Sequence, residues 1–440
     1  MIIDMPKAVD NIIRILNDAG YEAYIVGGCV RDSLLGTYPS DWDITTSATP
    51  ECVKSLFRRT VDTGIKHGTV TVLDHDEQYE VTTYRIDGEY NDGRHPESVE
   101  FTNELREDLR RRDFTINAMA YHPSTGLVDL FGGREDLDAG IIRCVGDARE
   151  RFGEDALRMM RAVRFAARLG YAIEQSTFDA IKELASTLSK VSAERIREEA
   201  VKLLVSDHPE FFRLFYESGL TSVFMPEFDE MMHTGQNHPH HKYGVGDHTL
   251  VALQNIRADR LLRLAILFHD IAKPRVLKTD AKGITHFYGH PAVSEKMACE
   301  IMRRLKFDNA TISTVSKLVL YHDRKIELND YAVRKVMCEM GAEIFPLYLE
   351  VRMADTLAQS EYLRDEKIET IEGLRRIYND ITEKKQCVKI SELAVSGKDL
   401  IKSGVKPGPQ IGALLECMLQ EVLRYPEHNN AEYLLKTYVK

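Results

Sequence analysis

The stretch from Gly27 to Asp43 constrains this chain more than any other, because it places a glycine turn close to two carboxylates. The apolar run Ala23–Val26 leads into Gly27-Gly28, the pattern of a strand that ends where the backbone approaches another group closely. After the turn, Val30–Leu35 predicts a short helix. Its first N–H groups and the glycine turn together would form an anion site.

Asp41 and Asp43 follow a second turn, Gly36–Ser40. On a strand, both side chains would point to the same side, with their β-carbons about 7 Å apart. Two hard oxygen donors beside a phosphate cradle suit Mg²⁺, and two such ions stabilise an in-line phosphoryl displacement. Either motif alone is most simply a turn with solvated acids. The two motifs together in one short stretch favour phosphoryl-transfer chemistry.

This stretch, Gly-Gly-x-x-x-Asp followed by Asp-x-Asp, resembles the head of the nucleotidyltransferases that extend RNA 3′ ends. These are the class II tRNA nucleotidyltransferases (CCA-adding enzymes) and the related bacterial poly(A) polymerases. The resemblance implies an α+β fold, in which a small α/β palm-like head is followed by an all-α neck, body and tail. It also implies catalysis by Asp41 and Asp43 with Mg²⁺, and nucleotide binding by Gly28 and Arg31.

A second motif, Arg111-Arg112-Asp113-Phe-Thr-Ile-Asn117, carries clustered arginines that match triphosphate oxygens by charge and geometry. Asp113 and Asn117 offer hydrogen bonds to ribose hydroxyls. The motif resembles the family's ribose-binding motif, which implies nucleotide contacts for Arg112, Asp113 and Asn117. The identity of a third head carboxylate stays open between Asp113 and Glu80, which lies in a predicted strand and is equally well explained as a surface acid.

The segment Ile86–Pro96 is polar, glycine-rich and interrupted by turn residues, which predicts a mobile loop near the site. It resembles the flexible loop that CCA-adding enzymes need for adding the terminal A and that CC-adding relatives have lost. Asp92, Gly93 and Arg94 are intact, so this loop favours complete CCA addition over a plain surface loop. Gly132-Gly133 resembles the family's head–neck hinge, although a hairpin turn also explains it.

The segment Glu154–Leu169 predicts a single helix that ends at Gly170. Asp155 and Arg158 share one face of it, and the simplest account is an ion pair worth a few tenths of a kcal/mol. Cytosine and adenine, however, both present an amino donor beside a ring-nitrogen acceptor. An Asp acceptor next to an Arg donor matches both bases and neither uracil nor guanine.

The same segment resembles the family's base-reading motif, which implies selection of CTP and ATP without a nucleic-acid template. Three more arginines in this segment are predicted to contact phosphates of the nucleotide or of tRNA: Arg161, Arg164 and Arg168. Glu194–Glu199 resembles the last family motif and is predicted to brace the nucleotide-binding helix through ion pairs.

In the second half of the chain, a predicted apolar helix, Leu261–Ile271, carries a His-Asp pair. This pair and its surroundings resemble the HD superfamily of metal-dependent phosphohydrolases. The resemblance implies a metal site with four ligands: His248, His269, Asp270 and Asp355. Two additional histidines, His290 and His322, match the subset of this superfamily that can hold a second metal. Such ligands suit Mn²⁺, Ni²⁺, Fe²⁺ or Zn²⁺ better than Mg²⁺ alone. The expected activity is hydrolysis of damaged 3′ ends or of 2′,3′-cyclic phosphates by a phosphodiesterase or phosphatase reaction. The alternative is that the helical scaffold was inherited and its activity was lost.

These features predict four parts. They are a nucleotidyltransferase head (1–150), a helical neck with the start of the body (151–232), an HD domain (233–365) and a helical tail that contacts tRNA (366–440). Seven cysteines without a Cys-x-x-Cys pair indicate reduced thiols and a cytoplasmic setting. No apolar run approaches the ~20 residues of a membrane span. The net charge of −11 argues weakly against a nucleic-acid partner, but the basic neck outweighs this average.

Three other functions remain open at this point. A bacterial poly(A) polymerase shares the head motifs, and an enzyme that adds only CC or only A lies equally close. A third possibility, from another class, is an HD phosphohydrolase whose head merely binds RNA. The intact loop and the two nucleotide motifs favour the addition of CCA to tRNA from CTP and ATP, with release of pyrophosphate.

Overall fold

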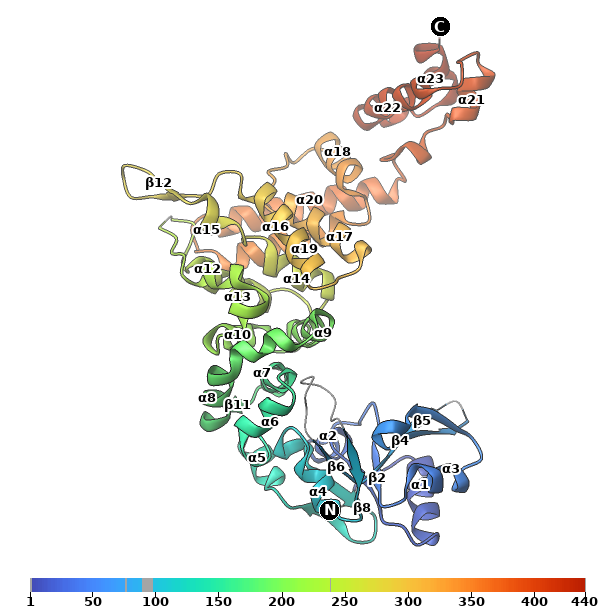
Figure 1. Cartoon of the computed structure of the whole chain (residues 1–440). Helices are drawn as coiled ribbons and strands as arrows, with labels where there is room; N and C mark the ends of the chain where they lie inside the picture. Colours follow the sequence, from blue (N-terminus) through green and yellow to red (C-terminus); the bar gives the residue numbers. More distant parts are fainter. Residues whose placement is uncertain (1, 76, 89–97, 238, 440) are drawn as a thin grey trace. The chain divides into compact units, whose positions relative to one another are not determined.

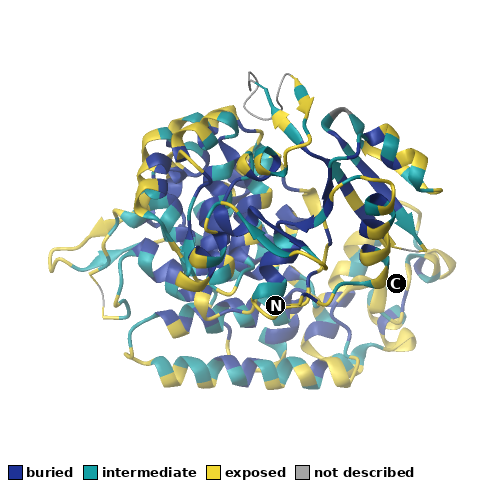
Figure 2. Cartoon of the chain, turned by 90° about the horizontal axis from the view of Figure 1, so that it is seen from below, coloured by how far each residue is buried: buried dark blue, intermediate teal, exposed yellow. Residues whose placement is uncertain are grey.

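The computed structural model describes the chain in four segments, residues 2–75, 77–88, 98–237 and 239–439. They form two compact units, residues 1–226 and 227–440 (Figure 1). The first unit holds a β-sheet followed by helices, and the second is helical apart from one small hairpin. The predicted α+β class is therefore confirmed. Buried residues, dark blue in Figure 2, lie on the inner faces of the strands and helices of each unit.

The head contains a seven-stranded sheet in the order β3-β4-β5-β2-β1-β8-β9. Its strands are β1 (Ala23–Val26), β2 (Ile44–Thr46), β3 (Thr60–Gly64), β4 (Thr69–Asp74), β5 (Glu77–Thr83), β8 (Met119–His122) and β9 (Gly126–Asp129). Strands β2 and β5 run parallel, and the other neighbours run antiparallel. Because β1 and β2 are neighbours near the centre, the glycine turn after β1 lies beside the residues that precede β2.

The described residues also form three two-stranded sheets. They pair β6 (Arg85–Asp87) with β7 (Val99–Phe101), β10 (Ile141–Ile142) with β11 (Ala172–Ile173), and β12 (Lys278–Thr279) with β13 (Thr285–His286). The predicted mobile loop Ile86–Pro96 begins too early, because Ile86 and Asp87 pair with β7 as part of β6. Asp92, Gly93 and Arg94 of that loop lie outside the described residues.

The helices of the first unit follow the apolar spacing of the sequence. They are α1 (Lys7–Asp18), α2 (Gly28–Leu34), α3 (Pro50–Leu56), α4 (Leu105–Arg110), α5 (Gly133–Ala139), α6 (Ala148–Glu154), α7 (Leu157–Leu169), α8 (Gln175–Leu184), α9 (Ala193–Leu204), α10 (Phe212–Glu217) and α11 (Thr221–Phe224). Helix α1, for example, buries Val9, Ile12, Ile13 and Leu16. The paired glycines do not form a hairpin turn, because Gly132 adopts a left-handed conformation directly before α5.

The prediction of one continuous helix from Glu154 is wrong. Helix α6 ends at Glu154, and α7 begins at Leu157. Between them, Asp155 has an extended backbone, and its Oδ1 accepts a hydrogen bond of 2.9 Å from the backbone N–H of Leu157. A short side chain that captures a backbone donor in this way competes with helical hydrogen bonding. The predicted end of α7 at Gly170 is confirmed, because that glycine takes a left-handed conformation.

The helices described in the second unit range from 4 to 20 residues in length. They are α12 (Pro226–Met232), α13 (Val245–Gln254), α14 (Arg260–Phe268), α15 (Lys273–Val276), α16 (His290–Arg304), α17 (Asn309–Tyr321), α18 (Asp330–Met340), α19 (Phe345–Ala358), α20 (Arg364–Glu383), α21 (Gly397–Lys402), α22 (Pro409–Arg424) and α23 (Ala431–Tyr438). Helix α14 ends before His269, so the His-Asp pair lies in the turn between α14 and α15 rather than inside a helix. Within the described segments, no helix is long and apolar enough to cross a membrane.

Gly133 leaves no room for a side chain, because a β-carbon there would lie 2.2 Å from the carbonyl oxygen of Thr115. We therefore expect Gly133→Ala to lower the free energy of unfolding of the head by about 2–3 kcal/mol. Gly153→Ala is the matched control, since Gly153 is helical with open space around it, and should stabilise by about 0.5–1 kcal/mol. Urea unfolding measures the free energy of unfolding of both variants. Equal values for the two variants would contradict the predicted clash with the carbonyl oxygen of Thr115.

Candidate functional site

The carboxylates of Asp41 and Asp43 lie directly before strand β2. The carbonyl of Asp43 accepts a hydrogen bond of 3.0 Å from the N–H of Val26, which extends the pairing of β1 with β2 by one residue. Asp41 and Asp43 are exposed, whereas Trp42 between them is buried. This alternation places both carboxylates on the same side of the chain, although the regular strand begins only at Ile44.

Glu80 lies next to this carboxylate pair. In the parallel pairing of β2 with β5, Ile44 lies opposite Val81, so Asp43 and Glu80 are neighbours one residue earlier on each strand. Desolvation by the surrounding protein raises the pKa of Glu80, and the negative charges of Asp43 and Asp41 raise this pKa further. Desolvation also raises the pKa of Asp43. A divalent cation would relieve the repulsion among these groups.

Arg112 lies close to the glycine turn and acts electrostatically on Asp43. A β-carbon at Gly27, where φ is +82°, would lie 3.0 Å from NH1 of Arg112, so the guanidinium is in close contact with the turn. Its charge also opposes the rise in the pKa of Asp43. The Nε of Arg112 is buried and has no hydrogen-bond partner within the described residues. This donor and the glycine turn, continued by Gly28 at the start of α2, suit the oxygens of a triphosphate.

Sequence reasoning missed Asp108, which holds both arginines of the second motif. Its fully buried carboxylate accepts hydrogen bonds from Arg111 at 2.7 and 3.0 Å, from Arg112 at 3.3 Å and from Thr45 at 3.0 Å. Although burial acts in the opposite direction, the two arginines lower the pKa of Asp108. The spacing of three and four residues between Asp108 and the arginines was the available signal.

Asp113 and Asn117 contact protein groups rather than facing open solvent. Arg161 of α7 donates to Oδ2 of Asp113 from both Nε and NH2, at 2.8 and 2.6 Å. Asn117 donates to Oδ1 of Asp113 at 3.2 Å and accepts from the buried Arg31. Burial would raise the pKa of Asp113, but Arg161 and Asn117 lower it to about 2. This chain of contacts joins the head to the neck helix.

Among the described residues, Asp155 and Arg158 do not form an ion pair with each other, which was the simplest explanation of their spacing. Asp155 instead pairs with Arg195 of α9 at 2.7 Å. Arg158 pairs with Glu154 at 2.5 Å and donates to the carbonyl of Arg111 at 3.0 Å. Each predicted base-reading group is therefore held by a different neighbour. The ion pair from Arg195 is of the bracing kind that the sequence predicts for the segment Glu194–Glu199.

Arg164 and Arg168, the remaining arginines of α7, differ in how exposed their side chains are and so in whether they could contact a phosphate. Arg164 is 9% exposed and is paired with Glu199 at 2.5 Å, so its charge is used inside the neck. Arg168 has a side chain that is 47% exposed and reaches Asp32 of α2 at 3.1 Å. The ring of Phe165 lies against guanidinium groups on both sides of the head–neck junction, those of Arg31, Arg161 and Arg164.

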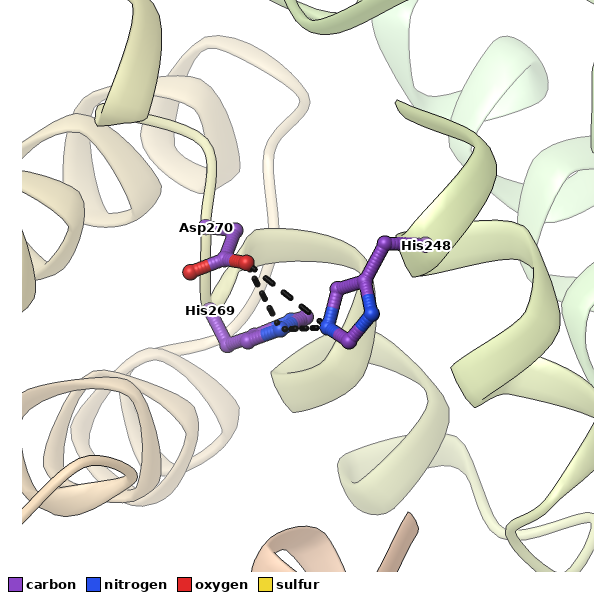
Figure 3. Close-up of side chains that lie close together, drawn as sticks. All are labelled: His248, His269 and Asp270. Carbon is purple, nitrogen blue, oxygen red and sulfur yellow. Dashed lines mark hydrogen bonds and ion pairs between the residues drawn. The ribbon is translucent and has the colours of Figure 1, made fainter. Parts of the chain in front are cut away.

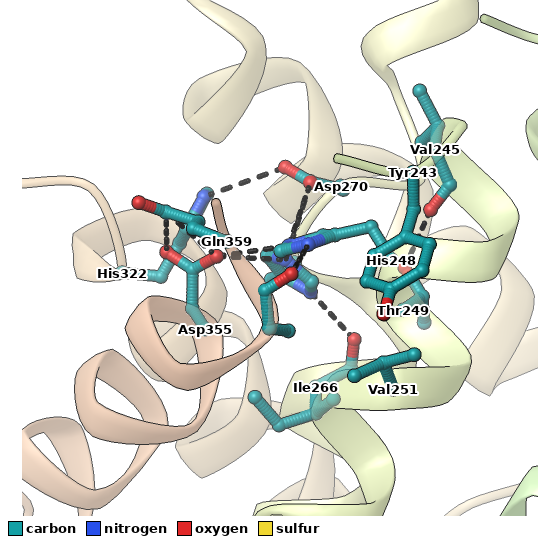
Figure 4. A network of polar contacts seen from close by, with 12 residues as sticks. Tyr243, Val245, His248, Thr249, Val251, Ile266, Asp270, His322, Asp355 and Gln359 are labelled. Carbon is teal, nitrogen blue, oxygen red and sulfur yellow. Dashed lines mark hydrogen bonds and ion pairs between the residues drawn. The ribbon is translucent and has the colours of Figure 1, made fainter. Parts of the chain in front are cut away.

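In the second unit, two overlapping clusters of buried groups have the spacing of metal ligands. One contains His248, His269 and Asp270, and the other contains Asp270, His290 and His322. Within each cluster the ligand atoms lie within 4.8 Å of one another. Figure 3 shows the first of the two clusters. Asp355 of α19 extends the first cluster, with its Oδ1 2.9 Å from Nε2 of His248 (Figure 4).

The four histidines share one hydrogen-bonding pattern. Each Nδ1 faces a backbone carbonyl, which can only accept, so each Nδ1 carries a proton. The pairs are His248 with Ala358 at 3.3 Å, His269 with Ile266 at 2.6 Å, His290 with Phe287 at 2.9 Å, and His322 with Val319 at 2.7 Å. All four Nε2 atoms are therefore left to point inward. This is the orientation that a second contact gives to metal-ligating imidazoles.

The inward-facing atoms do not satisfy one another. The Nε2 atoms of His290 and His322 are 3.1 Å apart, and those of His248 and His269 are 3.4 Å apart, so at most one atom of each pair can donate. Among the described residues, the buried Oδ2 of Asp270 has no hydrogen bond of regular geometry, although it lies 2.7 Å from Nζ of Lys273 and 3.2 Å from Nε2 of His269 in ion pairs. Converging lone pairs beside buried carboxylates fit a metal cation.

Asp43 and Asp113 should respond oppositely to the loss of their charge. The pKa of Asp43 is raised by folding, so its ionised form destabilises the fold above the unfolded pKa, and Asp43→Asn should raise Tm at pH 7 without divalent metal. The pKa of Asp113 is lowered to about 2, so Asp113→Asn should cost roughly 2 kcal/mol at pH 7.

The Asp43 difference should shrink as the pH falls through its raised folded pKa toward the unfolded pKa near 4, whereas the Asp113 difference should begin to shrink only below about pH 4 and disappear as the pH approaches about 2. Calorimetry of the two variants between about pH 2.5 and 7 measures this. Shifts of Tm in the same direction at pH 7 would contradict the electrostatic assignment.

Comparison with known proteins identifies the family. Residues 23–143 match the model of the poly A polymerase head domain, residues 170–232 that of a probable RNA- and SrmB-binding site of polymerase A, and residues 276–438 that of a putative tRNA nucleotidyltransferase domain 2. The CCA-adding enzyme of Leuconostoc mesenteroides is 35% identical, covering 97% of this chain and 95% of that protein. The enzyme of Lactobacillus helveticus is 38% identical, covering 97% and 94%.

Among solved structures, the Bacillus stearothermophilus CCA-adding enzyme in complex with CTP aligns with a TM-score of 0.73 and 32% identity, covering 98% of both chains. These relatives match nearly the whole length of the chain, and their sequence identities of 32–38% indicate a shared family rather than only a shared fold. The chain belongs to the CCA-adding enzymes, the tRNA nucleotidyltransferases.

Proposed function

We propose that this chain adds C, C and A in turn to the 3′ end of tRNA, using CTP and ATP and releasing pyrophosphate. The observation that carries this proposal is the grouping of Asp41, Asp43 and Glu80 beside the glycine turn and Arg112, with the neck helix fixed next to them. Seven free thiols support a cytoplasmic setting.

The carboxylates are proposed to bind Mg²⁺, with Asp41 and Asp43 as the main ligands and Glu80 as the third carboxylate. Glu80 is preferred over Asp113 because Arg161 already occupies the carboxylate of Asp113. Bound Mg²⁺ would neutralise the charge that develops on the α-phosphate and its attacking and leaving oxygens. The protein groups supply the alignment: the glycine turn and Arg112 hold the triphosphate while the tRNA 3′-hydroxyl attacks in line.

Base selection is proposed to lie with Asp155 and Arg158. The carboxylate of Asp155 would accept from the amino group that cytosine and adenine share, and Arg158 would donate to the adjacent ring nitrogen. Arg195 and Glu154 hold these two side chains in separate ion pairs, which limits their rotation before a base arrives. A fixed donor–acceptor pair rejects uracil and guanine because it would leave buried polar groups unpaired.

Asp92, Gly93 and Arg94 are proposed to support addition of the terminal A. This role still rests on the sequence alone. An enzyme restricted to CC or to A, or a poly(A) polymerase, would carry the same head geometry. The length and similarity of the curated CCA-adding relatives favour complete CCA addition.

The carboxylate assignment predicts that Asp41→Ala and Asp43→Ala each reduce nucleotide addition by roughly a thousandfold or more. The assay extends tRNA that lacks CCA with CTP and ATP and resolves the products at single-nucleotide length. Asp62→Ala is the control, because Asp62 is a partly exposed carboxylate paired with Lys54 on the surface of the head. Near-normal activity of the Asp41 or Asp43 variant would refute the assignment.

A second activity is proposed for residues 227–440, favoured by the inward-facing imidazoles. We propose that this unit binds Mn²⁺, Ni²⁺ or another divalent transition metal through His248, His269, Asp270 and Asp355. A second ion would use His290 and His322 with Asp270. The bound metal would lower the pKa of its water and so supply a nucleophile for phosphodiester or phosphomonoester hydrolysis.

The metal assignment predicts that His269→Ala loses bound Mn²⁺ or Ni²⁺ and any phosphodiesterase activity, while tRNA extension continues near the wild-type rate. Metal content after gel filtration and hydrolysis of 2′,3′-cyclic AMP measure the two effects. His233→Ala, at an exposed histidine of the same unit, should retain metal. Equal metal content in the two variants would contradict the site.

A further inference from the structure

The metal-ligand cluster of the second unit is open to solvent on one side. The side chains of His248, His269, Asp270 and His322 are at most 2% exposed, whereas that of His290 is 10% exposed and that of Asp355 is 15% exposed. Because Asp355 is the most exposed of these six side chains, we expect a substrate to reach the centre on its side. The groups around this carboxylate form the mouth of the site, and they indicate what kind of substrate fits.

Lys367 of α20 is fixed at this mouth. Gln359 donates to both carboxylate oxygens of Asp355, each at 3.1 Å, and Nζ of Lys367 donates to Oε1 of Gln359 at 2.6 Å. The same Nζ lies 3.2 Å from Nδ1 of His240. Lys367 therefore lies one residue away from a proposed metal ligand, and its two hydrogen-bond partners within the described residues are an amide oxygen and an imidazole nitrogen rather than a carboxylate. Its positive charge interacts with Asp355 and Asp323 at a distance, and would attract an anion that approaches the cluster.

The mouth also has an aromatic side. The loop around His240 is tied to the connection between α19 and α20, because Ser360 donates to the carbonyls of Pro239 and His240 at 2.6 and 3.0 Å. Tyr362 in this connection is 53% exposed, and its ring centre lies 4.9 Å from that of His240. An exposed ring beside a cation is the combination that binds a base and its phosphate in single-stranded nucleic acid.

We propose that Lys367 and Tyr362 form the substrate-binding mouth of this metal centre, and that its substrate is a nucleoside phosphate. Lys367 contacts a non-bridging phosphate oxygen, and Tyr362 stacks on the base. This inference rests on the proposed metal site. It keeps the phosphate-ester substrates proposed for that site and divides the recognition of phosphate and of base between two residues.

Binding to the Mn²⁺-loaded full-length protein tests the inference by calorimetry, with inorganic phosphate and 3′-AMP as probes. Lys367→Met should weaken both probes about tenfold, because both carry a phosphate. Tyr362→Ala should weaken 3′-AMP about five- to tenfold and leave inorganic phosphate unchanged. Tyr362→Phe should restore 3′-AMP binding. Lys384→Met, at the end of the same helix, is the matched control and should bind both probes normally.

Mn²⁺ affinity is measured first on each variant. This measurement distinguishes failure of the proposed metal site from failure of the inference about Lys367 and Tyr362. A wild-type protein that binds no Mn²⁺ would overturn the metal site itself and the inference with it. Normal Mn²⁺ binding with unchanged phosphate affinity in Lys367→Met would overturn the inference alone. Loss of Mn²⁺ from Lys367→Met would also overturn it, because the lysine would then support Asp355 rather than bind substrate.

Discussion

The contact between Arg161 and Asp113 is the interaction on which the head site most depends. It joins helix α7 to the segment that carries Arg111 and Arg112, and its carboxylate is buried. Arg158, one turn earlier on α7, contacts the carbonyl of Arg111. The proposed base-reading and triphosphate-binding groups are therefore held in one assembly. Removing one partner of a buried ion pair is strongly destabilising, so this junction favours a rigid arrangement over an adaptable one.

Both proposed centres use the same physical device: a polar group is oriented by a second contact behind it. Asp108 orients two arginines in the head, and backbone carbonyls orient four histidines in the second unit. In the second unit these contacts leave imidazole nitrogens facing one another, and in the head the oriented Arg112 lies near the mutually repelling carboxylates of Asp43 and Glu80. Crowded carboxylates in the head and converging imidazole nitrogens in the second unit are stabilised when a cation binds.

Much of this was predictable from local sequence patterns. The strand Ala23–Val26 and the end of the neck helix at Gly170 follow from glycine placement and apolar spacing. The break at Asp155 was missed, because a side-chain hydrogen bond to Leu157 outweighs a helical pattern that is otherwise continuous. The supporting roles of Asp108 and Gln359 were missed for another reason. Acids and amides three or four residues from a predicted site residue are common, and only the fold shows that Asp108 is fully buried and that Gln359 contacts both Asp355 and Lys367.

Incubation of the purified protein with tRNA lacking its CCA end, in Mg²⁺ and with CTP and ATP separately and together, tests the central claim most directly. Products are resolved at single-nucleotide length. The account predicts two added residues with CTP alone and one further residue when ATP is also present, after which addition stops. Long A tails with ATP alone, or no extension under any condition, would contradict it.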